Sequence, residues 1–190
     1  MKPFLFLLFF GTAFQSFGQL TKNNWLVGGI GSFSSREGTY STQSISYDSK
    51  YTDLTIAPNV GYFIADKFAS GIRTTFSWEK SKTFPPGGGS TDIKRIVVGP
   101  FLRYYFLNID SRINLLIDAN IQIGAYNAGV SKGNITNYGF KTGPAVFFNS
   151  VVAFELLFGY YSNVEDVKNS YKNDLRGIQI NAGLQIHLEK

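Results

Sequence analysis

Residues 113–126 read INLLIDANIQIGAY, and their alternation decides the fold class. The odd-numbered positions all carry isoleucine, leucine or alanine, whereas the even-numbered positions carry mostly asparagine, aspartate, glutamine and glycine. Leu116 is the one aliphatic residue on the polar face. Because successive side chains of a β-strand point to opposite faces, this pattern predicts a strand with one apolar and one polar face.

The same alternation recurs along the chain. Residues 175–188, LRGIQINAGLQIHL, repeat it clearly, and six further stretches show weaker versions. The first stretch is the least regular, because WLVGGIGSF (25–33) alternates convincingly on neither face. We predict strands at about residues 24–34, 52–63, 68–79, 93–106, 113–126, 137–148, 151–161 and 175–188.

The connections between these strands differ in length in a regular way. Short turns are predicted at 64–67, 107–112 and 149–150, and they alternate with longer polar loops at 35–51, 80–92, 127–136 and 162–174. In an up-and-down meander, this places all short connections at one end and all long ones at the other. The predicted fold is therefore an all-β, eight-stranded antiparallel up-and-down barrel.

Three prolines interrupt otherwise strand-like sequence at equivalent places. Pro58, Pro100 and Pro144 each precede an aromatic pair and a short turn, as in VVGPFLRYYF (97–106). Proline has no N–H to donate to a sheet ladder, and a closed barrel has no edge strand where that loss is harmless. We predict an irregularity in the ladder, a local bulge or bend, beside each proline.

Alternation alone allows either a soluble barrel with an apolar lumen or a membrane barrel with an apolar exterior. Charged residues are 16% of the chain, against about 25% in typical soluble domains. The polar face is rich in glycine, asparagine, glutamine, threonine and serine, which suit a narrow lumen. The apolar face lacks charges through the middle of the later strands, and aromatic residues gather near strand ends. These features predict a transmembrane barrel.

The N-terminal residues predict export. MKPFLFLLFFGTAFQSFGQ (1–19) has one cation, an apolar run too short to span a bilayer, and small residues before Gln19. We predict a signal peptide at 1–18, cleaved before Gln19, with the barrel domain at 19–190; an uncleaved anchor is the alternative. The basic residues are scattered, so we expect no nucleic-acid partner.

Charged residues on the predicted inner face are the most informative cluster. Counting from the short turns places Arg73, Arg103, Asp118 and Glu155 at similar depth. We predict that they form a buried salt-bridge network that plugs the lower lumen, since an unpaired charge there would be costly. An ion gate is the alternative function for the same residues.

The sequence offers little for catalysis or for metal and cofactor binding. It has no cysteine, and its single histidine, His187, lies at the end of the last predicted strand. No serine and aspartate are placed near His187 by the sequence. We therefore predict no catalytic, cofactor or metal site, and we expect a polar role for His187 at the lumen mouth.

With these features the chain resembles the porin-like outer-membrane β-barrel proteins of the OmpA/OmpX type. The segments VGPFLRYYF (98–106) and TGPAVFFNSVVAFELLFGYY (142–161) carry the resemblance, together with the signal peptide and the alternating connections. It implies a bacterial outer membrane, short periplasmic turns and extracellular loops. The last strand departs from the pattern, because it ends Leu188-Glu189-Lys190 and not on an aromatic residue.

The resemblance specifies architecture better than activity. We expect a monomeric, non-enzymatic barrel with a structural or surface-interaction role. Its expected partners are outer-membrane lipid, lipopolysaccharide and an extracellular ligand held by loops 35–51, 80–92, 127–136 and 162–174. A narrow channel for ions or small solutes is the second hypothesis, a lipid- or lipopolysaccharide-modifying enzyme the third, and a soluble ligand-binding barrel the fourth.

Overall fold

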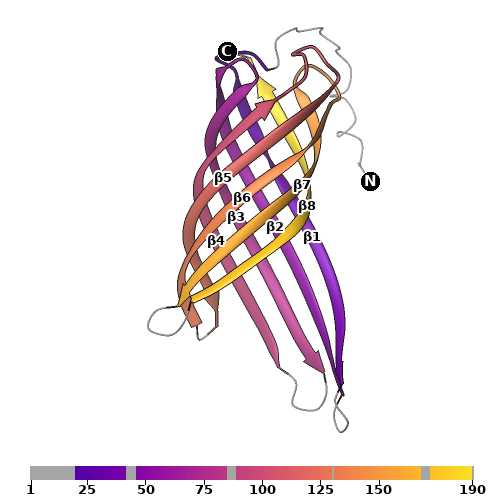
Figure 1. Ribbon diagram of the computed structural model, residues 1–190, viewed down its shortest axis with the longest axis vertical. Coiled ribbons are helices and arrows are strands. Elements are labelled where there is room, and N and C mark those ends of the chain that lie inside the picture. Colours follow the sequence, from indigo (N-terminus) through magenta and orange to yellow (C-terminus); the bar gives the residue numbers. More distant parts are fainter. Residues whose placement is uncertain (1–19, 42–45, 85–88, 130, 168–171, 190) are drawn as a thin grey trace, which may run out of the picture.

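The computed structural model describes residues 20–41, 46–84, 89–129, 131–167 and 172–189. Eight strands form a closed antiparallel barrel in chain order, which confirms the predicted fold (Figure 1). They are β1 (Trp25–Ser41), β2 (Ser46–Ala65), β3 (Phe68–Phe84), β4 (Ser90–Tyr105), β5 (Ile113–Ala128), β6 (Ser131–Phe147), β7 (Val152–Val167) and β8 (Lys172–Leu188).

A helix with the length and hydropathy of a membrane span is absent from the described part of the chain. The predicted signal peptide, residues 1–18, lies outside the described residues.

The predicted division into two faces is confirmed on every strand where it was clear. On β4, Val98 and Leu102 are exposed on the outside, whereas Phe101 and Arg103 are fully buried in the lumen. β5 and β8 follow the same rule, with isoleucine and leucine outside and asparagine or glutamine inside. The outer wall is therefore apolar and the inner wall is mixed.

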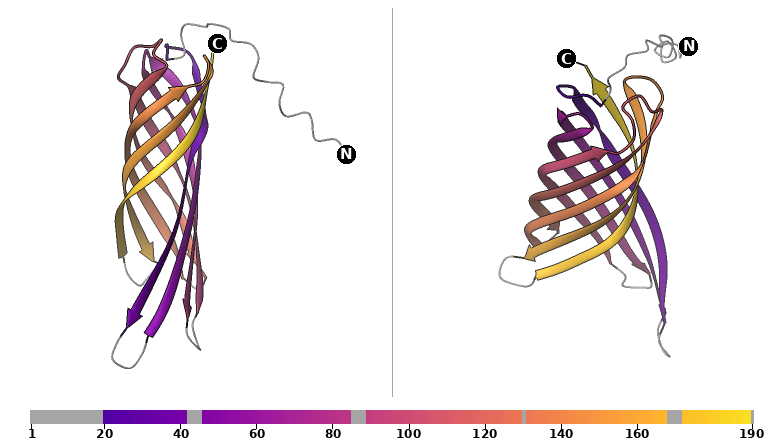
Figure 2. Two further views of the ribbon diagram at one scale, coloured as in Figure 1. Left: turned by 90° about the vertical axis from the view of Figure 1, so that its right-hand side faces the viewer. Right: turned by 45° about the horizontal axis from the view of Figure 1, so that its top comes forward.

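The predicted long loops are wrong in extent. The β1–β2 ladder continues to Ser41 opposite Ser46, and the other three long hairpins are likewise paired almost to their tips. Most of 35–51, 80–92, 127–136 and 162–174 is therefore strand, and Figure 2 shows the β1–β2 hairpin projecting beyond the ends of β7 and β8. Both faces of these ribbons are polar, so period-two hydrophobicity could not mark them as strands.

The ladder irregularity predicted at each proline is confirmed. Pro58, Pro100 and Pro144 remain paired with the preceding strand, but pairing with the following strand is interrupted beside each of them. The last pairs on the two sides of each interruption are Ile56↔Phe76 and Asn59↔Arg73 for Pro58, Val98↔Ile123 and Phe101↔Asn120 for Pro100, and Thr142↔Phe158 and Ala145↔Glu155 for Pro144. The register is the same on both sides of each interruption. Of the two predicted forms, a bulge or a bend, the bulge is therefore excluded at the prolines, because no residue is inserted.

Closure of the barrel between its first and last strands is only partial. The β1–β8 ladder joins Trp25–Gly31 to Ala182–Leu188, although β1 continues to Ser41 and β8 begins at Lys172. Beyond Gly31 and Ala182 the two strands diverge, as Figure 1 and the right-hand view of Figure 2 show. We call this junction the β1–β8 seam.

Candidate functional site in the barrel lumen

The lumen is filled from the short-turn end upward, and its first layer is apolar. Four rings meet there: Phe63, Tyr105, Phe147 and His187, with centroid separations of 5.2–6.2 Å. Aliphatic residues complete this apolar plug, namely Leu20, Leu26, Leu116 and Leu157 with Ala69, Ala145 and Ala153. The plug closes the lumen at the end where the short turns lie.

The plug has only weak signals in the sequence. Leu116 stood out only as an exception on a polar face, and Leu26 made the first strand irregular. In the structure both are fully buried and point inward. An inner face that is apolar near the short turns and polar above them explains why β1 alternates poorly, since Leu26 and Ile30 are both inside. His187 is buried within the plug and is not at an open lumen mouth.

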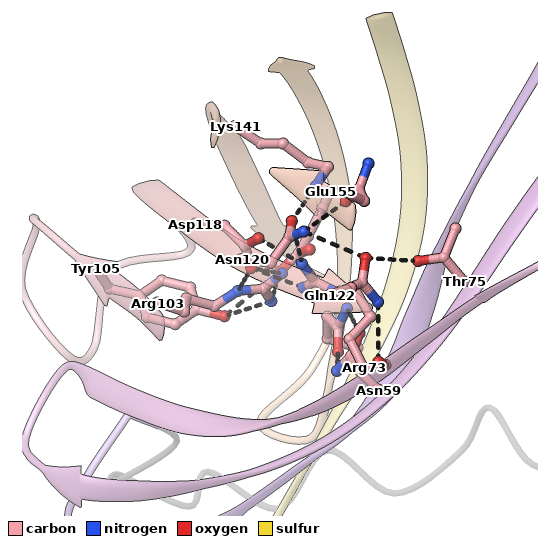
Figure 3. A network of polar contacts seen from close by, with 12 residues as sticks. Asn59, Arg73, Thr75, Arg103, Tyr105, Asp118, Asn120, Gln122, Lys141 and Glu155 are labelled. Carbon is pink, nitrogen blue, oxygen red and sulfur yellow. Dashed lines mark hydrogen bonds and ion pairs between the residues drawn. The ribbon is translucent and has the colours of Figure 1, made fainter. Parts of the chain in front are cut away.

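An ion network lies directly above the plug and contains all four predicted residues (Figure 3). Asp118 accepts two hydrogen bonds from the Arg73 guanidinium, at 2.6 Å and 2.7 Å, and a third from Arg103 Nε at 3.0 Å. Arg103 also donates to Glu155 Oε1 at 2.7 Å. These residues come from β3, β4, β5 and β7, so the network ties half of the barrel wall together.

Aromatic groups enclose the ion network from below. Arg73 lies over the Phe101 ring, with 4.6 Å between the guanidinium carbon and the ring centroid. The Tyr105 hydroxyl donates to Glu155 Oε1 at 3.4 Å and accepts from Arg103 at 3.3 Å. All five of these side chains are almost fully buried. In such surroundings each charge depends on its partner, because water does not reach it.

A layer of amides continues the network upward. Asn59 and Gln185 exchange two hydrogen bonds of 3.0 Å and 3.2 Å over Gly28 of the intervening strand β1. Asn120 donates to Gln122 and to Asn137. Neutral amides can donate and accept at once, so these side chains bond to one another, and Asn120 also accepts from Arg73.

The Asn59–Gln185 pair gives a testable prediction. Asn59→Ala leaves the buried Gln185 amide without its partner and should lower the free energy of unfolding by about 1–2 kcal/mol. The double variant Asn59→Leu/Gln185→Leu removes both polar groups and should cost less than the sum of the single leucine variants. Urea unfolding in lipid vesicles measures both effects, and strictly additive single changes would show that the two amides are not coupled.

Lys141 is the remaining cation at this level. Its ammonium donates to Asn120 Oδ1 at 2.9 Å, and the residue is only 5% exposed. Among the described residues, no carboxylate lies within ion-pair distance of Lys141, in contrast to Arg73, Arg95 and Arg103. It therefore presents a positive charge that the barrel does not neutralise by a direct contact.

A cavity of about 680 Å³ opens above the amide layer. Arg95, in its lining, forms ion pairs with Glu79 of the neighbouring strand β3 at 3.0 Å and with Glu165 of β7 at 2.7 Å. Lys141 and Gln122 lie at its lower end. Glu165 belongs to a segment predicted as a loop, so only the extension of β7 reveals its inward position. A volume in this range is typical of sites for small molecules.

Within the described ranges, no group of three histidine, cysteine, aspartate or glutamate side chains is placed to hold a metal ion. The cavity lining offers hydrogen-bonding groups, basic side chains and apolar contact.

Comparisons with known proteins agree with this architecture. No protein-family model and no curated protein sequence matches the chain. Among solved structures, the outer membrane protein OprG from Pseudomonas aeruginosa is similar, with 13% identity, a TM-score of 0.51, and coverage of 91% of this chain and 99% of that one. Neisserial surface protein A is similar at 16% identity and a TM-score of 0.51, over 86% and 96% of the two chains. At these identities the likeness is one of fold: the chain shares the eight-stranded barrel of these two outer-membrane proteins.

Proposed function

We propose that the protein is an integral outer-membrane barrel that does not conduct along its axis and that binds a ligand in the upper cavity of its lumen. The closed lower lumen carries this proposal. The apolar plug and the ion network together occupy the barrel from Leu26 up to Asp118, with every contributing side chain almost fully buried. Because the lower lumen is closed, the upper cavity suits binding of a ligand better than passage of a solute along the barrel axis.

The outer surface supports insertion into a membrane. Outward positions of 25–33, 56–64, 68–78, 96–106, 113–125, 138–146, 152–164 and 178–188 carry no lysine, arginine, aspartate or glutamate. These stretches are long enough to span the hydrocarbon core, which needs about 9–11 tilted residues. Rings also gather at both ends of this belt: Trp25 packs on Tyr62 near the short turns, and Phe76 stacks on Trp78 toward the other end.

The remaining parts of the proposal follow from this placement. A signal peptide at 1–18 directs export, the short turns face the periplasm, and the long hairpins and the cavity face the outside. Outer-membrane lipid and lipopolysaccharide then surround the belt. We assign the cavity a binding role and no catalytic one, because the single histidine, His187, is enclosed in the apolar plug.

Electrophoresis with and without boiling tests the membrane barrel. The folded chain is expected to resist detergent and to run as a compact species until it is heated, as closed membrane barrels do. Fractionation of the producing cells should place the same heat-modifiable band in the outer membrane. A band that is soluble, or that does not shift on heating, would contradict the proposal.

Planar-bilayer recording tests the closed lumen. We expect no discrete conductance steps from the wild-type protein, because the plug and ion network leave no continuous water path. The matched comparison is the variant Phe63→Ala/Phe147→Ala, which removes two rings of the plug. Regular single-channel openings by the wild type would favour the narrow-channel alternative.

A further inference from the structure

The β1–β8 seam leaves two strand edges unpaired beside the upper cavity. β1 from Ser32 to Ser41 pairs with β2 alone, and β8 from Lys172 to Asn181 pairs with β7 alone. No other described pair of neighbouring strands diverges over so long a stretch. The wall of the lumen is therefore interrupted on this one side.

The interruption begins at the level of the apolar belt. Counting upward from Leu188 at the short-turn end, about ten tilted residues span the hydrocarbon and reach Ile178. Pairing with β1 ends below this point, at Ala182. Ile178 is 84% exposed, and Phe33 across the seam is 70% exposed. The opening thus faces the outer part of the lipid layer and is flanked by large apolar side chains.

The cavity extends into this opening. Its lining includes inward residues of both strands, such as Ser34 and Gln179, but also the outward-facing Phe33, Ile178 and Ile180. The cavity therefore meets outward residues at the seam, as it also does at Trp78 of β3. The polar lumen and the outer surface are therefore continuous at the seam.

An apolar groove continues from the opening along the outer wall. It has a volume of about 560 Å³ and runs over Gly29 and Gly31 of β1, between Pro58 on one side and Ala182 and Leu184 on the other. Because glycine has no side chain, the strand surface itself forms the floor. Gly31 and Ala182 border the groove and are also the last pair of the β1–β8 ladder, so the groove leads up to the seam. This shape accommodates one extended hydrocarbon chain.

The charge of the cavity lining indicates which chemical group the other end of such a ligand carries. Its lining contains five basic residues and two acidic ones: Arg36, Arg73, Arg95, Lys141 and Arg176 against Asp53 and Glu79. Each of the four arginines has a carboxylate partner, whereas Lys141 at the cavity floor has none within ion-pair distance among the described residues. An anionic group on a ligand would supply this missing partner of Lys141.

We propose that the protein binds a long-chain fatty acid, with its carboxylate in the cavity at Lys141 and its alkyl chain passing through the β1–β8 seam into the groove over Gly29 and Gly31. The inference rests on the proposed placement in the outer membrane, which surrounds the groove with lipid. It names the ligand class and a lateral route between the outside and the membrane that bypasses the closed lower lumen.

Photolabelling in phosphatidylcholine vesicles tests the route. A palmitate analogue with a photoreactive group in its chain should label β1 and β8 around the seam, and unlabelled palmitate should abolish that labelling. Gly31→Phe fills the groove at a position where an added Cβ has a single neighbour, at 3.4 Å. It should lower seam labelling about tenfold, equivalent to about 1.4 kcal/mol. Ala119→Phe adds the same ring to the outward face of β5 and should change nothing.

A second pair of measurements tests the carboxylate contact. Lys141→Gln should weaken competition by palmitate about tenfold, since it removes a charge-assisted hydrogen bond. The same variant should leave competition by palmitamide unchanged, because that molecule has the same chain and no charge. Equal loss for both competitors would show that the substitution only disturbed the fold.

The outcomes distinguish this inference from the proposed function. A heat-modifiable barrel that is labelled evenly around its belt, without competition, would overturn the fatty-acid site and leave the membrane barrel intact. A chain that never forms the heat-modifiable species would contradict the outer-membrane assignment itself. Competition by phosphatidylglycerol equal to that by palmitate would replace the fatty acid by an ordinary anionic membrane lipid and overturn the proposal.

Discussion

Asp118→Ala is expected to lower the free energy of unfolding by about 3–5 kcal/mol, the usual cost of removing one partner from a buried ion network. Asp118 accepts three hydrogen bonds from Arg73 and Arg103, and all three residues are almost fully buried. Removing its carboxylate leaves Arg73 without an anionic partner and gives Arg103 only Glu155. The urea midpoint of the heat-modifiable band in lipid vesicles measures the effect.

Two further variants test whether the loss of stability comes from the buried ion network. Glu155→Ala should cost a few kcal/mol, less than Asp118→Ala, because Arg103 keeps its contact with Asp118. Asp92→Ala is the matched control: its pair with Lys80 is exposed and 3.9 Å long, so it should cost at most about 0.5 kcal/mol. Equal urea midpoints for Asp118→Ala and Asp92→Ala would show that the network contributes no more than a surface pair.

Gly124→Val is expected to destabilise the barrel by about 3 kcal/mol, the upper end of the cost of overpacking. A Cβ added at Gly124 would lie 1.9 Å from the Ile96 carbonyl oxygen and 2.8 Å from the Val97 Cα. These are backbone atoms of β4, so no side-chain rotation can relieve the contact, and β4 and β5 would have to separate. The fraction of chain that refolds into the heat-modifiable form, together with its urea midpoint, measures the loss.

Gly38→Val is the matched control for this substitution. Gly38 lies in the β1–β2 hairpin, and an added Cβ there has no neighbour within 4 Å. Valine is favoured over glycine in strands, so this variant should be neutral or slightly stabilising. The two substitutions make the same chemical change, so the difference between their unfolding free energies is expected to come from packing. A neutral Gly124→Val would mean that β4 and β5 are further apart than the structure places them.

Much of the architecture was predictable from the chain. Residues 113–126 and 175–188 alternate without ambiguity, and the structure places their faces as predicted. Arg103 could be assigned to the lumen because it lies in phase with buried positions of β4. The interruptions beside Pro58, Pro100 and Pro144 were predictable as well, since the missing N–H is a property of the residue itself.

Other features could not be predicted, for identifiable reasons. The polar ribbons at the tips of the long hairpins carry no hydrophobic signal, because solvent contacts both of their faces. The apolar plug was missed because an inward leucine such as Leu116 reads as an exception in a pattern that expects a polar lumen. Glu165 was assigned to a loop and therefore was not recognised as a partner of Arg95.

The sequence by itself determined the number of strands and, where the alternation is clear, which residues lie on the apolar and on the polar face. The physical reason is local: the side-chain direction follows from the backbone of adjacent residues. Only the tertiary structure decided which polar groups meet, such as Arg103 with Glu155 or Asn59 with Gln185, and where β1 and β8 stop pairing. These depend on the stagger accumulated around the closed barrel, which brings the two ends of the chain together at a register that no short stretch encodes.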